Sequence, residues 1–336
     1  MGSTIKDVAD RAGVSITTVS HVINKTRFVS DELRDRVQRA MDELGYRPNN
    51  LARSLRMGAT RSIGLVVPDN SNPFFAEIAR YIEDIGFTNG YSVFLCNSDS
   101  KVDKELAYIN TLIAKMVDGV IFITSASTPE HIQALNAYEI PVVVVDRRVP
   151  SALADVVLVN NELGGYLATH CLIKHGHRRI ACITGPSALT PSADRVLGFR
   201  RAMQEAGLPV NEAWLATGNF RADGGETAMC EILAAPEHPT AVFACNDMMA
   251  IGALRMLRGA NLKVPEDISV VGYDDIPIAA QISPALTTVA QPVEQMASIA
   301  TQLLLSRIQN ERGIEQTEQH MLDPRLVLRD SCALLP

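Results

Sequence analysis

The 336-residue sequence contains no long hydrophobic run, and no leader in which a basic segment precedes an apolar one. A membrane-spanning helix needs roughly 20 apolar residues, and a secretory signal needs such a leader. Membrane insertion and secretion therefore find no support in the sequence. We expect the protein in the cytoplasm.

Metal-binding and catalytic motifs are also missing. The six cysteines are scattered and form no C-x-x-C pair, which favours buried, reduced thiols over a disulfide framework or a zinc ribbon. The stretch "HCLIKHGH", residues 170–177, has poor spacing for zinc ligands, so we interpret it as structural or surface. No G-x-x-x-x-G-K-[ST], G-x-S-x-G or H-E-x-x-H motif occurs. We expect no enzyme, no cofactor and no bound metal.

The composition and the distribution of charge point to a globular chain with a distinct N-terminal module. Hydrophobic residues make up 47% of the chain and charged residues 21%, which is typical of two or three folded domains at this length. The net charge is −7, but residues 1–61 carry 11 Lys+Arg against 7 Asp+Glu (11 − 7 = +4), which leaves −11 for the remainder. A basic module on an acidic body is expected where only that module approaches a polyanion.

The N-terminal residues show three short helical patterns. Thr4 and Asp7 have the spacing of a capping box, and the apolar residues that follow recur at helical intervals as far as Gly13. Ser15 can cap a second helix, and a third begins at Ser30 and ends near residue 45. Two short helices joined by a tight turn, with a third completing the core, form a helix-turn-helix pattern.

The second of these helices leaves mostly short polar side chains off its core face. A recognition helix presents such side chains to base edges and phosphates in the major groove. A generic three-helix protein-binding domain, with its histidine on the surface, is the alternative. The residues concerned are Ile16, Thr17, Ser20, His21 and Asn24.

The segment "NNLARSLR", residues 49–56, reads as helical but is shorter than the roughly 12 to 15 residues that an isolated helix needs in water. It could fold when docked on DNA, with Arg53 and Arg56 near phosphates and an apolar side chain inserted between base pairs. Paired segments from two protomers would then couple DNA affinity to the distance between the protomers. A plain amphipathic linker is the alternative.

From Ile63 onward, apolar strand patterns alternate with helical patterns, which predicts parallel sheets covered on both faces. The first series runs from "IGLVVP" to "PVVVVD". The second runs from "VVLV" to a helix between Val293 and about Asn310. Two similar doubly wound lobes are predicted, with ligands bound beyond the carboxyl ends of the strands.

These strand ends carry polar and aromatic residues from both series. Aromatic rings can cover the C–H faces of a sugar, while carboxylate, guanidinium and amide groups pair with its hydroxyls. A small polyol is the ligand class that fits best, although each residue taken singly could be a helix cap, a core residue or a solvated charge. The strand ends comprise residues 69–75, Thr124, Ser125, Asp146, Arg147, Arg195, Phe220, Asn246, Asp247, Asp274, Asp275 and Gln291.

Several blocks of the chain resemble recurring blocks of one family. "TIKDVADRAGVS", "TTVSHVIN", "LARSLR", "FACNDMMAIGA", "ISVVGYDD" and "PRLVLRDSC" look like those of the lactose-repressor family of bacterial transcription regulators, and most like those of its ribose repressors. The resemblance implies a small all-α helix-turn-helix head plus a hinge helix, joined to a two-lobed α/β body like that of periplasmic sugar-binding proteins. The implied boundaries are residues 1–48 for the DNA-binding domain, 49–61 for the hinge helix and linker, and 62–336 for the effector-binding and dimerisation domain.

The resemblance further implies a homodimer whose heads read a pseudo-palindromic operator with a central CG step, into which Leu55 is wedged. Such a regulator would be associated with the bacterial nucleoid. The sequence lacks the leucine heptads of a tetramerising tail, which favours a dimer. The implied DNA-contacting residues are Thr4, Ile16, Thr17, Thr18, Ser20, His21, Asn24, Arg27, Tyr46, Ala52, Arg53, Leu55 and Arg56.

For the body, the resemblance implies a ribose-like site and release from DNA by ribose or a similar sugar, as in repressors of sugar-utilisation genes. Thr124 stands about where ribose binders often have asparagine, and Leu189 and Pro191 lack the polar groups expected near a purine ring. A corepressor-dependent regulator that binds a purine or another small metabolite, a sugar-modifying enzyme and a transport-type binding protein are the alternatives. The implied ligand set is Asn72, Phe74, Phe75, Thr124, Asp146, Arg147, Arg195, Phe220, Asn246, Asp274 and Gln291.

Overall fold

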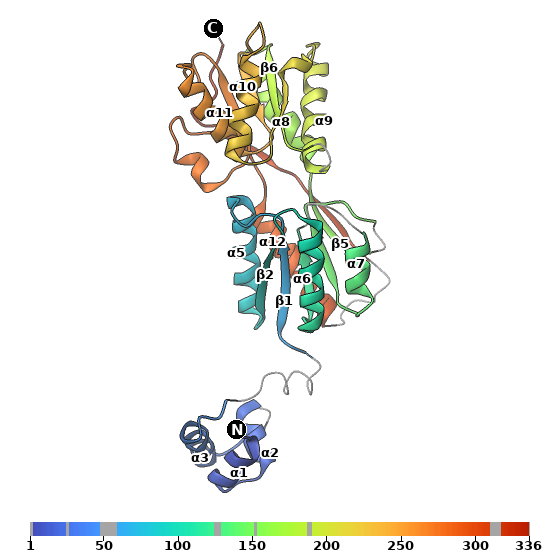
Figure 1. Cartoon of the computed structure of the whole chain (residues 1–336), viewed down its shortest axis with the longest axis vertical. Coiled ribbons are helices and arrows are strands. Elements are labelled where there is room, and N and C mark those ends of the chain that lie inside the picture. Colours follow the sequence, from blue (N-terminus) through green and yellow to red (C-terminus); the bar gives the residue numbers. More distant parts are fainter. Residues whose placement is uncertain are drawn as a thin grey trace. The chain divides into compact units, whose positions relative to one another are not determined.

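The computed structural model of the chain describes residues 3–24, 27–47, 59–123, 129–150, 153–186, 190–309 and 317–335. The expected hinge helix, and with it Ala52, Arg53, Leu55 and Arg56, lies outside these residues, as do Thr124 and Ser125. The chain forms two compact units, Met1–Thr60 and Arg61–Pro336 (Figure 1). None of the described helices is both long enough and apolar enough to cross a bilayer.

The N-terminal unit is the predicted three-helix fold. The Thr4 backbone N–H donates to the Asp7 carboxylate at 2.8 Å, and the Asp7 N–H donates back to the Thr4 hydroxyl at 3.3 Å, which confirms the capping box. Gly13 ends the first helix with φ +63°, and an added Cβ there would lie 2.9 Å from the Arg36 guanidinium. Val8, Val19 and Val37, one from each helix, are fully buried together. The helices are α1 (Ile5–Ala12), α2 (Ile16–Asn24) and α3 (Asp31–Glu43).

The N-terminal lobe of the body is a parallel six-stranded sheet in the order β11-β5-β4-β3-β1-β2. Its four central strands, β5, β4, β3 and β1, are almost continuously apolar and are buried at every position. Helices cover both faces of this part of the sheet: α5 and α12 pack together on one side, and α6 and α7 on the other. The elements are β1 (Ser62–Val67), α5 (Pro73–Thr88), β2 (Ser92–Asn97), α6 (Val102–Ala114), β3 (Gly119–Phe122), α7 (Pro129–Asn136), β4 (Val142–Val145), β5 (Asp155–Val159), α12 (Val293–Ile308) and β11 (Gln319–Leu322).

The C-terminal lobe repeats this architecture in the order β12-β10-β9-β8-β6-β7, with β12 antiparallel to β10. Helices α8 and α9 pack against each other, as do α10 and α11 (Figure 1). The elements are α8 (Asn161–Lys174), β6 (Ile180–Thr184), α9 (Thr190–Glu205), the 3₁₀ turn η1 (Glu212–Trp214), β7 (Leu215–Thr217), α10 (Ala222–Leu233), β8 (Ala241–Ala244), α11 (Asp247–Gly259), β9 (Ser269–Asp274), η2 (Pro277–Ala280), β10 (Thr287–Ala290) and β12 (Arg325–Val327).

The predicted division into two consecutive series was wrong in one respect. Strand β5 and helix α12 belong to the N-terminal lobe, so the chain passes between the lobes after β5, after β10 and between β11 and β12. Hydrophobic periodicity identifies a strand but not its neighbour in the sheet, and for that reason the crossings were not predicted. Helix α5 begins at Pro73, which places Phe74 and Phe75 in its first turn.

Candidate functional site

A cavity of about 480 Å³ lies between the two lobes of the body. It is formed where strands of both sheets end, as the strand-end rule predicts. Gln291 does not line it directly; its side-chain amide donates to the Asp274 carboxylate at 2.7 Å. The predicted residues that line the cavity are Asn72, Phe74, Phe75, Asp146, Arg147, Arg195, Phe220, Asn246 and Asp274.

The aromatic wall of the cavity is set by a helix start. The Asn72 side chain caps α5 by accepting the backbone N–H of Phe74 at 3.1 Å, and Pro73 fixes the first turn. The Phe74 and Phe75 rings then lie edge to face, with centroids 5.1 Å apart. Phe220 comes from the other lobe and has a φ of +63°, a costly conformation for a bulky residue.

Asp146 and Arg147 form a buried ion pair just after β4. One nitrogen of Arg147, Nη1, donates both to the Asp146 backbone carbonyl at 2.7 Å and to its carboxylate at 2.6 Å. Burial lowers the pKa of Arg147, while the neighbouring carboxylate opposes that shift. Asp146 has a φ of +63°, so the backbone at this strand end is also held in the left-handed region.

Arg195 is the buried cation of the C-terminal lobe. Its guanidinium lies 3.7 Å from the centroid of the Tyr273 ring and donates to the Cys245 carbonyl at 2.6 Å. It also donates to the Asn161 side chain at 2.8 Å, and the Tyr273 hydroxyl donates to that same oxygen at 3.0 Å. The position of the Arg195 guanidinium is therefore fixed by α8, by β9 and by the residue that follows β8.

Asp274, at the end of β9, is the titratable acid of the site. Burial raises its pKa to about 7, although Arg195 at 3.7 Å and the amide of Gln291 favour the charged form. Asp247 lies behind it at the start of α11, where burial and the Asp274 charge raise its own pKa. The Asp247 carboxylate is held by the Thr288 hydroxyl at 2.6 Å and by the Ile276 N–H at 2.9 Å.

Several buried polar atoms in and beside the cavity have no hydrogen-bond partner among the described residues. They are Oδ1 of Asp146, Nε of Arg147 and Oε1 of Gln291. An unpaired buried polar group costs about 1 to 3 kcal/mol, so native structures satisfy almost all of them. Two acceptors and one donor suit a ligand with hydroxyl groups, because a hydroxyl both donates and accepts.

Other residues of the cavity were missing from the predicted set. Asp99 and Ser100 follow β2, and Asn219 and Arg221 flank Phe220 after β7. The strand-end rule applied to these two strands would have identified them. Asp69, which belongs to the predicted stretch 69–75, lines the cavity and accepts from Arg221 of the other lobe at 2.7 Å.

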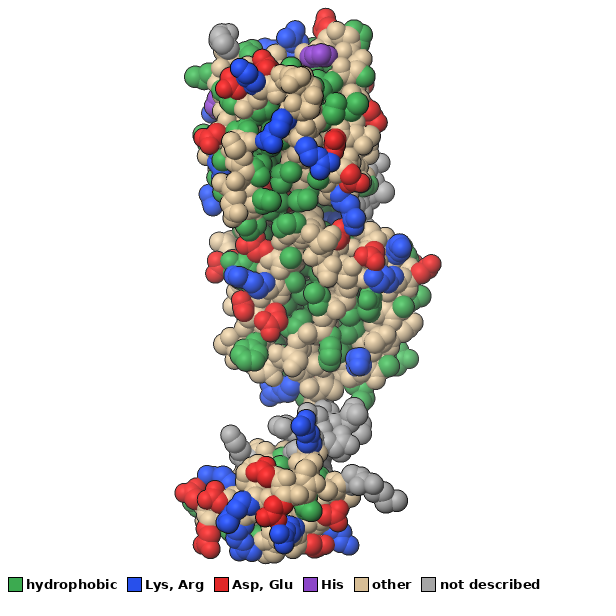
Figure 2. Space-filling view, turned by 60° about the vertical axis from the view of Figure 1, so that its left-hand side comes forward, with side chains coloured by type: hydrophobic (Ala, Val, Ile, Leu, Met, Phe, Trp, Pro, Cys, Tyr) green, Lys and Arg blue, Asp and Glu red, His purple; other side chains and the backbone are tan. Residues whose placement is uncertain are grey.

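In the N-terminal unit, the predicted DNA-contacting residues divide by exposure. Thr4, Ile16, Thr17 and Arg27 are exposed, whereas the others that are described are half-buried. Thr18 belongs to the cap of α2, where its N–H donates to Ser15 at 3.0 Å. The face shown in Figure 2 carries acidic and basic side chains interspersed over this unit. The half-buried residues are Thr18, Ser20, His21, Asn24 and Tyr46.

Sequence comparison identifies both parts of the chain. Residues 4–49 match the family model described as bacterial regulatory proteins, lacI family, and residues 169–332 match a periplasmic binding protein-like domain. The HTH-type transcriptional repressor PurR of Vibrio parahaemolyticus is 43% identical over 330 residues, which cover 98% of both chains.

Solved structures agree with this comparison over the whole fold. The lac repressor dimer bound to operator and the anti-inducer ONPF is 28% identical, with a TM-score of 0.88 over 99% of this chain and all of that one. A LacI family transcriptional regulator from Enterococcus faecium with bound ribose is 34% identical, with a TM-score of 0.75 over 82% of this chain and all of that one.

Proposed function

Since the chain belongs to the lacI family of bacterial regulatory proteins and is a ligand-responsive transcriptional repressor, not an enzyme, we propose that its effector is ribose or a similar small sugar. In this proposal, sugar bound between the lobes releases a pseudo-palindromic operator that controls sugar-utilisation genes. The protein acts in the cytoplasm. The observation that carries the proposal is the chemistry of the cavity between the lobes.

That cavity combines aromatic faces with buried charges, which is how proteins bind the C–H and hydroxyl faces of a sugar. Asp146, Arg147 and Arg195 are each about 95% buried, so their hydrogen bonds to a ligand are strong and leaving them unpaired is costly. The ribose-bound regulator from Enterococcus faecium supports the same ligand class.

The similarity to repressors named PurR favours a second candidate, in which a purine or another small metabolite acts as corepressor. The described lining speaks for the sugar, because carboxylates and guanidinium groups outnumber the amides that would read the edge of a base. The two candidates differ in the sign of the response: a sugar would release DNA, whereas a corepressor would be required for binding.

Dimerisation belongs to the proposed mechanism. Strand β2 is an edge of its sheet and carries large apolar side chains that solvent reaches. Phe94 and Leu95 on this strand are 40% and 48% exposed, and Leu106 on the following helix α6 is 42% exposed. Figure 2 shows hydrophobic side chains gathered on the surface of this lobe. An uncovered apolar edge strand invites association, and we propose that a second copy of the chain covers it.

The test is fluorescence anisotropy of a labelled palindromic operator with a central CG step, at fixed salt because DNA affinity depends steeply on it. The protein is added to the operator first, and ribose, other pentoses, hexoses or purine bases are then added to the complex. Release by a sugar supports the proposal. Binding that appears only with an added purine would establish the corepressor instead, and an absence of specific binding under every condition would contradict both.

A pair of variants separates the two activities. Leu55→Ala is expected to weaken operator binding and to spare sugar binding, because the hinge residue is proposed to enter the DNA. Arg147→Ala is expected to abolish the sugar response and to leave basal DNA binding intact. Equal effects of both variants on both activities would contradict this division of roles.

A further inference from the structure

A second cluster of reactive side chains lies in the C-terminal lobe and does not line the cavity. Cys171, His175 and Cys332 each offer one metal-ligating atom, and these atoms all lie within 4.8 Å of one another. Within the described ranges it is the one such group of three or more Cys, His, Asp or Glu side chains. The sequence interpretation of residues 170–177 as structural or surface did not include Cys332, which lies far away along the chain.

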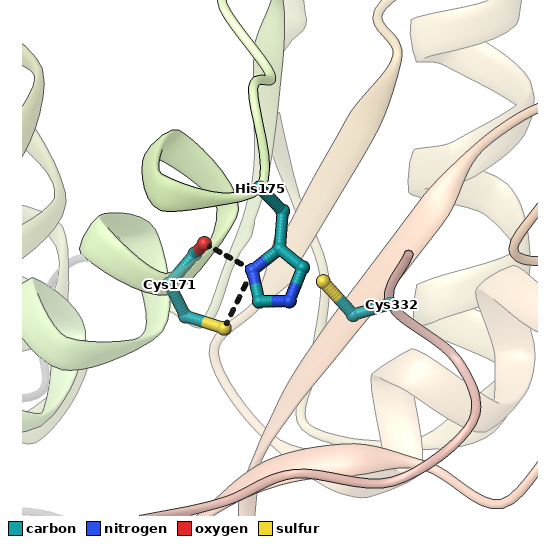
Figure 3. A group of neighbouring side chains, drawn as sticks. All are labelled: Cys171, His175 and Cys332. Atoms are coloured by element: carbon teal, nitrogen blue, oxygen red, sulfur yellow. Dashed lines mark hydrogen bonds between the residues drawn. The ribbon is translucent and has the colours of Figure 1, made fainter. Parts of the chain in front are cut away.

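The first two members of the cluster come from the end of one helix. Cys171 lies in the last turn of α8, and His175 is its C-cap, so the spacing of four residues places both side chains on one side of the helix. Figure 3 shows their side chains together, with the Cys332 sulfur pointing toward the imidazole from the chain segment that follows β12.

The segment that carries Cys332 is anchored on both sides of it. The Ser331 hydroxyl donates to the Val270 carbonyl at 2.6 Å and accepts the Thr287 N–H at 2.8 Å. Beyond Cys332, the Leu335 N–H donates to the His175 carbonyl at 2.8 Å. The third member of the cluster is therefore held against α8 by hydrogen bonds that do not involve its own side chain.

The His175 imidazole already has the orientation that a metal ligand needs. Nδ1 of His175 lies 2.8 Å from the Cys171 carbonyl, which can only accept a hydrogen bond, so Nδ1 carries the proton. The lone pair of this tautomer is on Nε2. Metal-bound histidines usually donate their other N–H to a backbone carbonyl in this way, which fixes both tautomer and ring orientation.

We propose that Cys171, His175 and Cys332 bind a thiolate-preferring d¹⁰ cation, Zn(II) or Cu(I), that ties the end of α8 to the C-terminal segment. Two thiolates and one imidazole are typical ligands of these ions. Tetrahedral zinc would bring the ligand atoms to roughly 3.5 to 3.8 Å from one another, and in the structure the three groups already lie within 4.8 Å of one another. His175 and Cys332 are partly exposed, so a fourth, solvent-derived ligand has access.

The experiment uses the full chain, reduced with a phosphine that does not bind metals. Cobalt(II) serves as the spectroscopic probe because thiolate ligation gives a charge-transfer band, and back-titration with Zn(II) gives the zinc affinity. Cu(I) is titrated in a separate arm against a chromophoric chelator specific for that ion. We expect one equivalent per chain, with an intense band that Zn(II) removes or, in the second arm, stoichiometric capture of Cu(I).

Cys332→Ser is expected to lower the affinity by about tenfold or more and to reduce the thiolate band. Cys230→Ser is the matched control, since Cys230 is exposed and lies outside the cluster. His175→Gln tests the third ligand, and circular dichroism of each metal-free variant establishes that it is folded. Unchanged binding in folded Cys332→Ser and His175→Gln, or a reduced wild-type chain that takes up neither ion, would overturn the proposal.

Discussion

Effector binding should depend on pH through Asp274. Its carboxylate is buried between the lobes, and burial raises its pKa to about 7, against an ordinary value of 3.8. The groups that face it are Arg195 from α9, Asp146 from the other lobe, Gln291, and Asp247 from α11. A sugar hydroxyl that donates to Asp274 binds the ionised form best, so affinity should rise as the pH rises through 7.

The magnitude follows from that pKa. If the ligand binds only the ionised form, its Kd scales as 1 + 10^(pKa − pH), so lowering the pH from about 8 to about 5.5 should raise the Kd roughly 30-fold. Asp274→Asn removes the titration and exchanges a charged hydrogen bond for a neutral one. This exchange should raise the Kd about tenfold at pH 8 and leave it nearly constant with pH.

Isothermal titration calorimetry with ribose, on the protein without DNA, measures both effects. Omitting DNA keeps the titration of the operator complex out of the result. A wild-type Kd that is constant from about pH 5.5 to 8 would refute the role of the Asp274 carboxylate. An Asp274→Asn variant that retains the wild-type slope would assign the titration to another group, since the substituted side chain cannot ionise.

Three further outcomes are expected. Arg147→Lys should raise the effector Kd roughly 10- to 100-fold by calorimetry, because an ammonium cannot replace the planar guanidinium; parallel loss of effector-free operator affinity by anisotropy would contradict this. Leu95→Glu should give a monomer in sedimentation velocity and weaken operator binding, whereas Leu197→Glu, which alters an exposed leucine of α9, should do neither. The effector-free protein should melt at a lower temperature at pH 8 than at pH 6. The raised pKa of Asp274 in the folded state contributes stability that is fully present below the unfolded value of 3.8 and is lost as the pH rises through about 7. Asp274→Asn should reduce this difference between the melting temperatures in calorimetry.

Local sequence signals predicted the parts of the fold that depend on local physics. The Thr4 capping box and the left-handed Gly13 set the first helix of the head, and apolar runs marked the strands of both sheets. The strand-end rule then located Asp146 and Asp274, because parallel strands deliver the residues after them to one edge of a sheet.

What the sequence could not predict depends on contacts between distant segments. Nothing local distinguishes β5 as a strand of the first sheet, and nothing near Arg195 shows that Asn161 and Tyr273 hold its guanidinium. The approach of Cys332 to Cys171 is of the same kind. Periodicity reports which face of an element is buried, whereas the partner across that face is set by the packing of the whole lobe.

The contacts between the lobes also show where the energy of the switch must come from. Among the ion pairs of the described residues, two join the lobes, Arg221 with Asp69 at 2.7 Å and Arg148 with Asp194 at 3.6 Å, and both arginine side chains are about 60% exposed. Exposed pairs contribute only about 0 to 1 kcal/mol each, whereas moving a two-state equilibrium from 1:99 to 99:1 requires about 5.5 kcal/mol of differential ligand affinity. The buried charges of the cavity belong to both lobes, so a ligand bound there contacts both lobes at once. These charges are therefore the groups able to supply that difference in affinity.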